Sequence, residues 1–226
     1  MLKAKWWKVL SFFLLLYTCT YGFIVKVPKL DDRMRESIRN MFFHVPMWFG
    51  MMILFFVSLF YAIKYLRSGN PVHDVYSYAY ASMGLVFGIL GIITGAFWAN
   101  YQWGSPWVGD PKQNGAAIAL LTYLAYFILR GSMVDEEKKA RIGAVYNIFA
   151  YFMLFPAIWI LPRLVESLHP GGMGSQGNPA VNPKDSSIEM KLVFWPAVLG
   201  WSLLGVWIST LRIRVQLLKE KQLNHE

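Results

Sequence analysis

The chain has 226 residues, of which 56% are hydrophobic, 17% aromatic and only 15% charged. Soluble globular proteins carry roughly 25% charged residues, so this composition excludes an ordinary soluble domain. The formal net charge is +9, but the 22 Lys and Arg residues lie in short segments between long apolar blocks, where membrane topology signals belong. A nucleic-acid-binding protein is therefore not indicated. The single cysteine, Cys19, lies inside an apolar block and supports neither a disulfide framework nor a CxxC site.

The apolar blocks are long enough to cross a membrane. A spanning helix needs about 20 largely apolar residues, and helices are favoured because lipid offers the backbone no hydrogen-bond partners. We predict an all-α, polytopic membrane protein that forms one domain, residues 1–226, with six transmembrane helices. The predicted spans are 6–25, 41–66, 75–98, 115–129, 142–161 and 192–211. The fourth is the shortest and is expected to borrow residues from its flanks.

The first apolar block could be mistaken for a signal peptide, since Lys3, Lys5 and Lys8 precede it. No small-residue cleavage site follows, because the block continues through residues 17–21. We therefore interpret this block as a retained first helix.

Cations that flank the spans indicate the orientation of the chain. Of the 22 Lys and Arg residues, 13 lie at the termini and in the loops after the second and fourth spans, and 9 lie on the other side. Because cytoplasmic loops carry the excess of cations, this bias favours both termini in the cytoplasm. In either orientation, the loops after the first, third and fifth spans share one face. That face holds His44, the tryptophan-rich loop 97–112 and His169.

Two histidines on this face are candidate metal ligands. His44 lies at the entrance of the second span, with Trp48 near it at helical spacing, and His169 follows the fifth span. A single histidine at a membrane interface is often only a tolerated polar residue. Two on one face, on either side of an aromatic loop, favour a site. Neutral imidazole is a common axial ligand of haem iron, and a pair above and below the flat macrocycle needs no local sequence spacing.

The loop between the third and fourth spans is unusually rich in tryptophan. An interfacial aromatic belt accounts for Trp98, but not for Trp103 and Trp107 in a loop bent by Gly and Pro. Aromatic planes on a fixed turn can stack on a large conjugated ligand. Asp110 ends the loop, where its carboxylate can anchor the turn by bonding backbone amides.

Two segments resemble a known family. Residues 103–112 read WGSPWVGDPK, which is similar to the tryptophan-rich signature of the haem-handling proteins of cytochrome c biogenesis, the CcmC, CcmF and CcsA superfamily. Residues 39–46, RNMFFHVP, resemble the first histidine motif of the CcmC branch. Family members often have tryptophan where Gly109 stands, and another aromatic residue where Pro106 stands. CcmF and CcsA carry additional histidines inside the membrane. We expect none within the spans here, so the CcmC branch fits best.

The resemblance implies a haem-handling protein rather than an enzyme. Its cofactor would be haem b, held at the periplasmic face of a bacterial inner membrane with His44 and His169 as the axial ligands of the iron. Haem would pass to a CcmE-like haem chaperone, alongside CcmA-like and CcmB-like ABC transporter subunits and a small CcmD-like subunit. Arg39 could pair with a haem propionate, or be an ordinary interfacial arginine. The expected haem-binding residues are His44, His169, Trp98, Trp103, Gly104, Trp107, Asp110 and Arg39.

Two other functions stay open from the sequence alone. A membrane b-type cytochrome would carry electrons, but it usually ligates haem from histidines within the bilayer. A cofactor-free transporter subunit usually has ionisable groups at mid-membrane, and the spans have almost none. A stripe of Gly84, Gly88, Gly91 and Gly95 in the third span indicates close helix packing, or room for the edge of a porphyrin.

Overall fold

The computed structural model describes residues 5–27, 32–169 and 187–223, and the regular structure in these ranges is entirely helical. Six helices are long and apolar enough to cross a membrane. This confirms the prediction of an all-α protein with six spans. The helices are α1 (Trp6–Ile24), α2 (Asp32–Ser37), the 3-10 helix η1 (Ile38–Asn40), α3 (Met41–Ser68), α4 (Pro71–Trp103), α5 (Pro111–Gly131), α6 (Glu136–Leu154), the π-helix η2 (Phe155–Ile160), α7 (Leu161–Leu164) and α8 (Ile188–Leu223).

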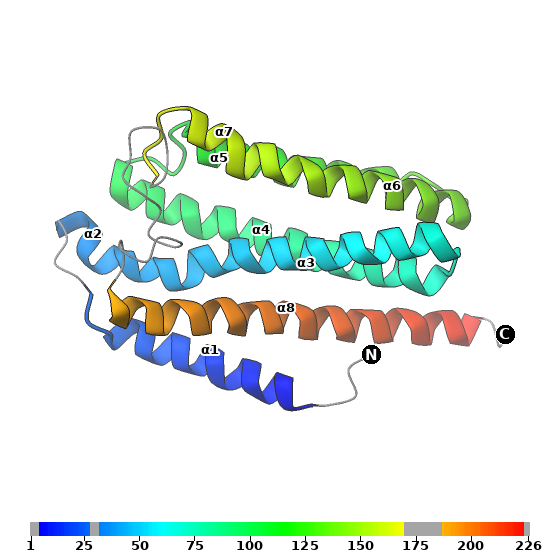
Figure 1. The fold of residues 1–226 in the computed structure, drawn as a ribbon, viewed down its shortest axis with the longest axis horizontal. Helices are drawn as coiled ribbons and strands as arrows, with labels where there is room; N and C mark the ends of the chain where they lie inside the picture. The colour runs from blue at the N-terminus through cyan, green and yellow to red at the C-terminus, as the bar shows by residue number, and fades with distance from the viewer. Residues whose placement is uncertain (1–4, 28–31, 170–186, 224–226) are drawn as a thin grey trace.

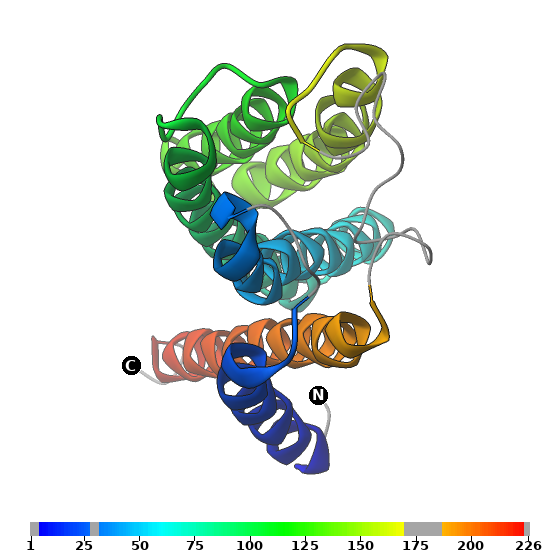
Figure 2. The same ribbon diagram turned by 90° about the vertical axis from the view of Figure 1, so that its left-hand side faces the viewer.

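The long helices pair into three layers (Figure 1, Figure 2). The α3–α4 pair lies in the middle, with α5 and α6 on one side and α1 and α8 on the other. A tight turn joins α3 to α4. Gly69 adopts a left-handed φ of 65°, and the Asn70 side chain accepts a hydrogen bond from the Val72 amide at 3.0 Å to cap α4.

The ends of these helices define where a site can form. α3, α5 and α8 begin, and α1, α4 and α7 end, at the left of Figure 1. We call this the site end, because it carries His44, the 104–110 loop and His169. α1 begins and α8 ends at the opposite end of the bundle. The structure therefore confirms that the two histidines and the tryptophan-rich loop share one face.

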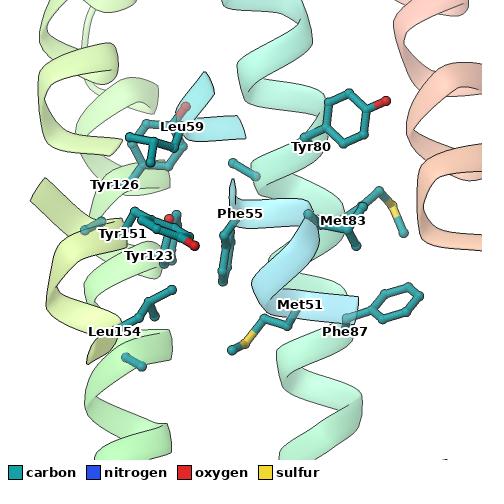
Figure 3. Packing of buried hydrophobic residues seen from close by; sticks show 14 of the residues in the cluster. Met51, Phe55, Leu59, Tyr80, Met83, Phe87, Tyr123, Tyr126, Tyr151 and Leu154 are labelled. Atoms are coloured by element: carbon teal, nitrogen blue, oxygen red, sulfur yellow. The ribbon is translucent and has the colours of Figure 1, made fainter. Parts of the chain in front are cut away.

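The glycine stripe of α4 is a close-packing surface for α3. A Cβ atom on Gly84 would lie 2.6 Å from the Phe55 ring, so the two helices approach as closely as they do only because these side chains are absent. Phe55 in turn stacks on Tyr123 of α5, with ring centroids 3.5 Å apart (Figure 3). The contacts of Gly84 with Phe55 and of Phe55 with Tyr123 therefore link α4, α3 and α5 in the core.

A buried polar cluster joins four helices beside this core. The Asn147 amide of α6 donates to the hydroxyls of Ser58 and Ser77 at 2.7 and 2.9 Å, and the Tyr123 hydroxyl lies 3.3 Å from Asn147 Oδ1. The Ser58 hydroxyl bonds the backbone carbonyl of Ser77 at 2.6 Å, and that of Ser77 bonds the carbonyl of Ser58 at 3.0 Å. Mutual hydrogen bonding explains how uncharged polar groups are accommodated between apolar helices.

Three predictions about the spans need correction. α4 runs on to Trp103, so Trp103 ends a helix instead of lying in a bent loop. His44 lies in the first turn of α3 and His73 in the first turn of α4, so two of the candidate spans do contain a histidine. The last helix continues to Leu223, well past the predicted end at 211. In the first and third cases the helix continues beyond the predicted end of the span. The short fourth span does borrow residues from its flanks, since α5 covers Pro111–Gly131.

Candidate haem-binding site

Asp110 ties the segment after α7 to the start of α5. Its carboxylate accepts hydrogen bonds from the Ser167 hydroxyl at 3.1 and 2.9 Å and from the Leu168 amide at 2.7 Å. Its Oδ1 lies 2.7 Å from Nδ1 of His169 and also accepts from the Lys112 amide at 2.8 Å, which caps α5. Asp110 is only 4% exposed. This buried carboxylate, which bonds backbone amides as predicted, therefore sets the position of His169.

A π-helix directs the chain towards Asp110. Between α6 and α7, residues 155–160 form η2, whose wider turn changes the direction in which the following residues leave the helix. η2 lies against α5 at Gly115, where an added Cβ would overlap the Ala157 carbonyl oxygen. Pro156 lies inside η2 and has no amide to donate. This distortion of the helix precedes the His169 segment.

The contacts of His169 establish which ring nitrogen carries the proton. A carboxylate only accepts hydrogen bonds, so Nδ1 is the protonated nitrogen. Burial lowers the pKa of His169, and although Asp110 opposes that shift, the charge of Lys112 reinforces it. Burial by itself would raise the pKa of Asp110, but His169 and the groups that donate to the carboxylate lower it overall. At neutral pH the pair is a carboxylate and a neutral imidazole, whose lone pair is on Nε2.

His44 has the same tautomer for a different reason. The Thr94 hydroxyl donates to the Leu90 carbonyl at 2.8 Å, so it accepts from Nδ1 of His44 at 3.1 Å. The indole N–H of Trp48 can only donate, and it lies 3.3 Å from Nε2. Both contacts require the proton on Nδ1 and the lone pair on Nε2. Both histidines therefore have the nitrogen arrangement of a neutral iron ligand.

Glycines of α4 make room for this part of the site. An added Cβ on Gly95 would lie 2.6 Å from Cε1 of His44, and one on Gly91 would lie 2.8 Å from the Trp48 ring. The absence of side chains at Gly91 and Gly95 thus leaves room for the Trp48 indole and the His44 imidazole of α3. The predicted role of the glycine stripe in close packing is confirmed. Gly84 packs against Phe55, whereas Gly95 packs against His44.

The tryptophans lie in different surroundings. Trp98 packs its edge against His44, with ring centroids 5.9 Å apart, and Trp103 packs against His169 at 4.9 Å. Trp107 is 42% exposed and follows Ser105, whose hydroxyl donates to the Trp107 carbonyl at 3.0 Å. Trp98 and Trp103 therefore each contact one histidine. Trp107, four residues after Trp103, has an exposed ring.

Two glycines shape the loop that carries Trp107. Gly104 ends α4 with a left-handed φ of 78°, and its amide donates to the Asn100 carbonyl at 3.0 Å. Gly109 has a φ of 73°, a conformation that a tryptophan would adopt only with strain. The turn that delivers Asp110 therefore favours glycine at position 109. In the structure Gly104 shapes the backbone of this loop, and its predicted contact with haem stays a prediction.

Arg39 is held at the end of α1. Its Nη1 donates to the carbonyls of Gly22 and Val25 at 3.0 and 2.8 Å, and its Nε pairs with Glu36 at 2.8 Å. Beside it is a pocket of about 340 Å³ at the site end, lined by Phe23, Ser37, Arg39, Asn40, Phe43, Phe97, Trp98 and Tyr101. Arg39 and Trp98 line this pocket together. Pairing of Arg39 with a propionate stays a prediction.

The residues present fit a haem ligand. His44 and His169 come from different layers of the bundle, and in each the hydrogen bond to Nδ1 orients Nε2. A hydrogen bond that fixes the second ring nitrogen is the usual partner of a metal-bound histidine. Aromatic rings beside both imidazoles suit a flat conjugated macrocycle. His73, by contrast, lies where α4 begins, at the opposite end of the bundle, and contacts the Ser68 hydroxyl at 2.9 Å.

Comparison with known proteins identifies the family. The family model described as "Heme exporter protein C", CcmC, matches residues 2–226. The chain belongs to the CcmC family. It is 25% identical to Heme exporter protein C of Haemophilus influenzae over 197 residues, which cover 84% of this chain and 75% of that protein. The corresponding protein of Bradyrhizobium diazoefficiens is 26% identical over 193 residues, with 84% and 71% covered.

A second group of relatives is longer. Cytochrome c biogenesis protein CcsA of Trachelium caeruleum is 33% identical over 154 residues, which cover 67% of this chain but only 44% of that protein. This CcmC-family chain thus spans less than half of the CcsA protein that it matches. The resemblance noted in residues 39–46 and 103–112 is confirmed at the level of the family.

Two residues of the site were missed by reading the sequence. Thr94 lies three residues after Gly91, on the face of α4 that the glycine stripe marks, so helical periodicity could have pointed to it. Ser167 has no such signal, because its contact with Asp110 spans 57 residues and depends on η2. Trp48 was placed near His44 by spacing, and its hydrogen bond confirms the placement.

Proposed function

We propose that this chain binds haem at the site end and presents it to a CcmE-like haem chaperone during cytochrome c maturation. The observation that carries the proposal is the matched pair of imidazoles, His44 and His169, each fixed through Nδ1 and each with its lone pair on Nε2. Membership of the CcmC family supports the haem-handling role, since its members are named for haem export.

Haem is the cargo in this proposal, and the protein's residues hold and orient it. His44 and His169 would supply the two axial nitrogens, and bound haem would supply the iron that they ligate. Trp98 and Trp103 would flank the ring beside these ligands, with the exposed ring of Trp107 nearby. The single cysteine, Cys19, lies in α1 and has no place among these residues, which supports haem b held without a covalent bond.

Release is as important as binding for a protein that delivers its cargo. The His169 side of the site is built on the 104–110 loop and the segment after α7, whereas the His44 side is built on two long helices. We propose that a chaperone approaches from the loop side, and that CcmA-like, CcmB-like and CcmD-like subunits accompany the chain. This work would be transfer and presentation rather than catalysis.

We propose that the site end faces the periplasm and that both termini lie in the cytoplasm. The cation bias supports this orientation, because 13 of the 22 Lys and Arg residues lie on the side of the termini. We expect an alkaline phosphatase fusion after Asp110 to be active and a fusion after Ser132 to be inactive, with the opposite pattern for a fluorescent reporter that folds only in the cytoplasm. Phosphatase activity after Ser132 but not after Asp110 would reverse the orientation.

The tryptophans give a test of the proposed platform. Replacement of Trp103 or Trp107 by alanine removes stacking area without touching the middle of any span, so we expect haem retention to fall about 2- to 10-fold while the protein still folds. Haem per protein after purification and the unfolding temperature measure the two effects. Unchanged haem content in both single variants and in the double variant would reduce the loop to an interfacial aromatic belt.

A further inference from the structure

Trp48 occupies the nitrogen of His44 that would bind iron. Its indole N–H lies 3.3 Å from Nε2, which is longer than the usual 2.9–3.0 Å of such bonds. The lone pair on Nε2 cannot accept this N–H and bind iron at the same time. The other nitrogen is committed to Thr94, so the imidazole cannot simply exchange the roles of its two nitrogens.

We propose that the N–H of Trp48 blocks the ligating nitrogen of His44 until haem displaces this hydrogen bond. The inference rests on the proposed function, because it assigns His44 to the iron. In the haem-free protein, the Trp48 N–H satisfies the lone pair on Nε2 of His44. When iron binds Nε2, the indole must give up this bond, and no covalent bond forms or breaks in Trp48.

The surroundings of Trp48 support this role. The indole lies in the hollow left by Gly91, one turn along α4 from the hollow that seats His44 at Gly95. Its ring and that of His44 meet edge to face, with centroids 6.1 Å apart. Packing against Gly91 of α4 therefore holds the Trp48 ring where its N–H meets Nε2 of His44. The hydrogen bond between them is long, so it is the contact that haem can displace most easily.

Haem titration of the full chain in detergent tests the competition. Trp48→Phe keeps the aromatic ring but loses the N–H. We therefore expect haemin, followed by its Soret absorbance, to bind about 2- to 10-fold more tightly than to the wild type. In a His44→Ala background the same substitution should change nothing, because there is no nitrogen to compete for. Trp201→Phe is the matched control, since its buried indole N–H has no hydrogen-bond partner within the described residues.

The outcomes separate this inference from the proposed function. Weaker or unchanged binding by Trp48→Phe, or equal tightening without His44, would refute the competition while leaving haem binding in place. Wild-type affinity in His44→Ala alone would overturn the proposed function and this inference with it. A measurement without haem checks the contact itself: the indole N–H resonance that is lost in Trp48→Phe should shift in His44→Ala. An unshifted resonance would contradict the hydrogen bond.

Discussion

His44→Ala and His169→Ala should each lower haem affinity by at least about 100-fold, with little change in the fold. Loss of only an outer partner of a metal-bound histidine costs about 10- to 100-fold, so loss of the ligand itself should cost at least as much. Two neutral histidines are expected to give a six-coordinate, low-spin iron. Each alanine variant should open one coordination position, which added imidazole can then fill. The visible spectrum and the haem-to-protein ratio at matched expression measure both effects.

His73→Ala is the internal control for this prediction. His73 lies where α4 begins, at the opposite end from the site, so its loss should leave the spectrum and haem content unchanged. All three variants are measured as the free protein, so a contribution of the chaperone to iron ligation does not enter the comparison. Identical spectra and equal haem content across the three would refute the two-histidine site and the core of the proposed function.

Asp110→Asn should weaken haem binding by about 10- to 100-fold, because Asp110 orients His169 without touching the iron. Asparagine has one acceptor oxygen where aspartate has two, so it cannot accept from His169, Ser167 and the Leu168 amide together. Asp135→Asn is a matched control. Asp135 also caps a helix, accepting from the Lys138 amide at 3.0 Å, but has no histidine beside it. Both variants should keep their helix cap, because asparagine caps a helix about as well as aspartate, whereas only Asp110→Asn should lose haem.

The titration of His169 separates orientation from general destabilisation. Its pKa is lowered by burial, so in the wild type Nε2 stays free for iron at neutral pH, and protons compete only as the pH falls through that lowered pKa. Asp110 raises the pKa of His169, so its neutral replacement should lower that pKa further. NMR of His169 in the haem-free protein measures it. A pKa of His169 that rises, or stays as in the wild type, in Asp110→Asn would contradict a direct contact between the Asp110 carboxylate and the His169 ring.

The sequence by itself determined the membrane class, the number of spans and the face that carries the candidate residues. The number of spans follows from the length of the apolar blocks, because a helix must be about 20 residues long to cross the bilayer. The shared face of His44 and His169 follows from parity, which no detail of packing can change. The motif in residues 103–112 also identified the family, since its tryptophans and Asp110 stand at fixed spacing.

The tertiary structure alone decided which atoms meet. No local pattern predicts that Asp110 would bind His169 across 59 residues, because that contact depends on the π-helix at residues 155–160 and on its close approach to Gly115. The pairing of His44 with Thr94 likewise depends on how closely α3 and α4 pack. Helical spacing alone places Trp48 beside His44. The direction of the Trp48 N–H depends on the packing of both rings against Gly91 and Gly95 of α4. Periodicity in a chain is local, whereas the protonation and orientation of a ligand are set by groups that packing brings from elsewhere.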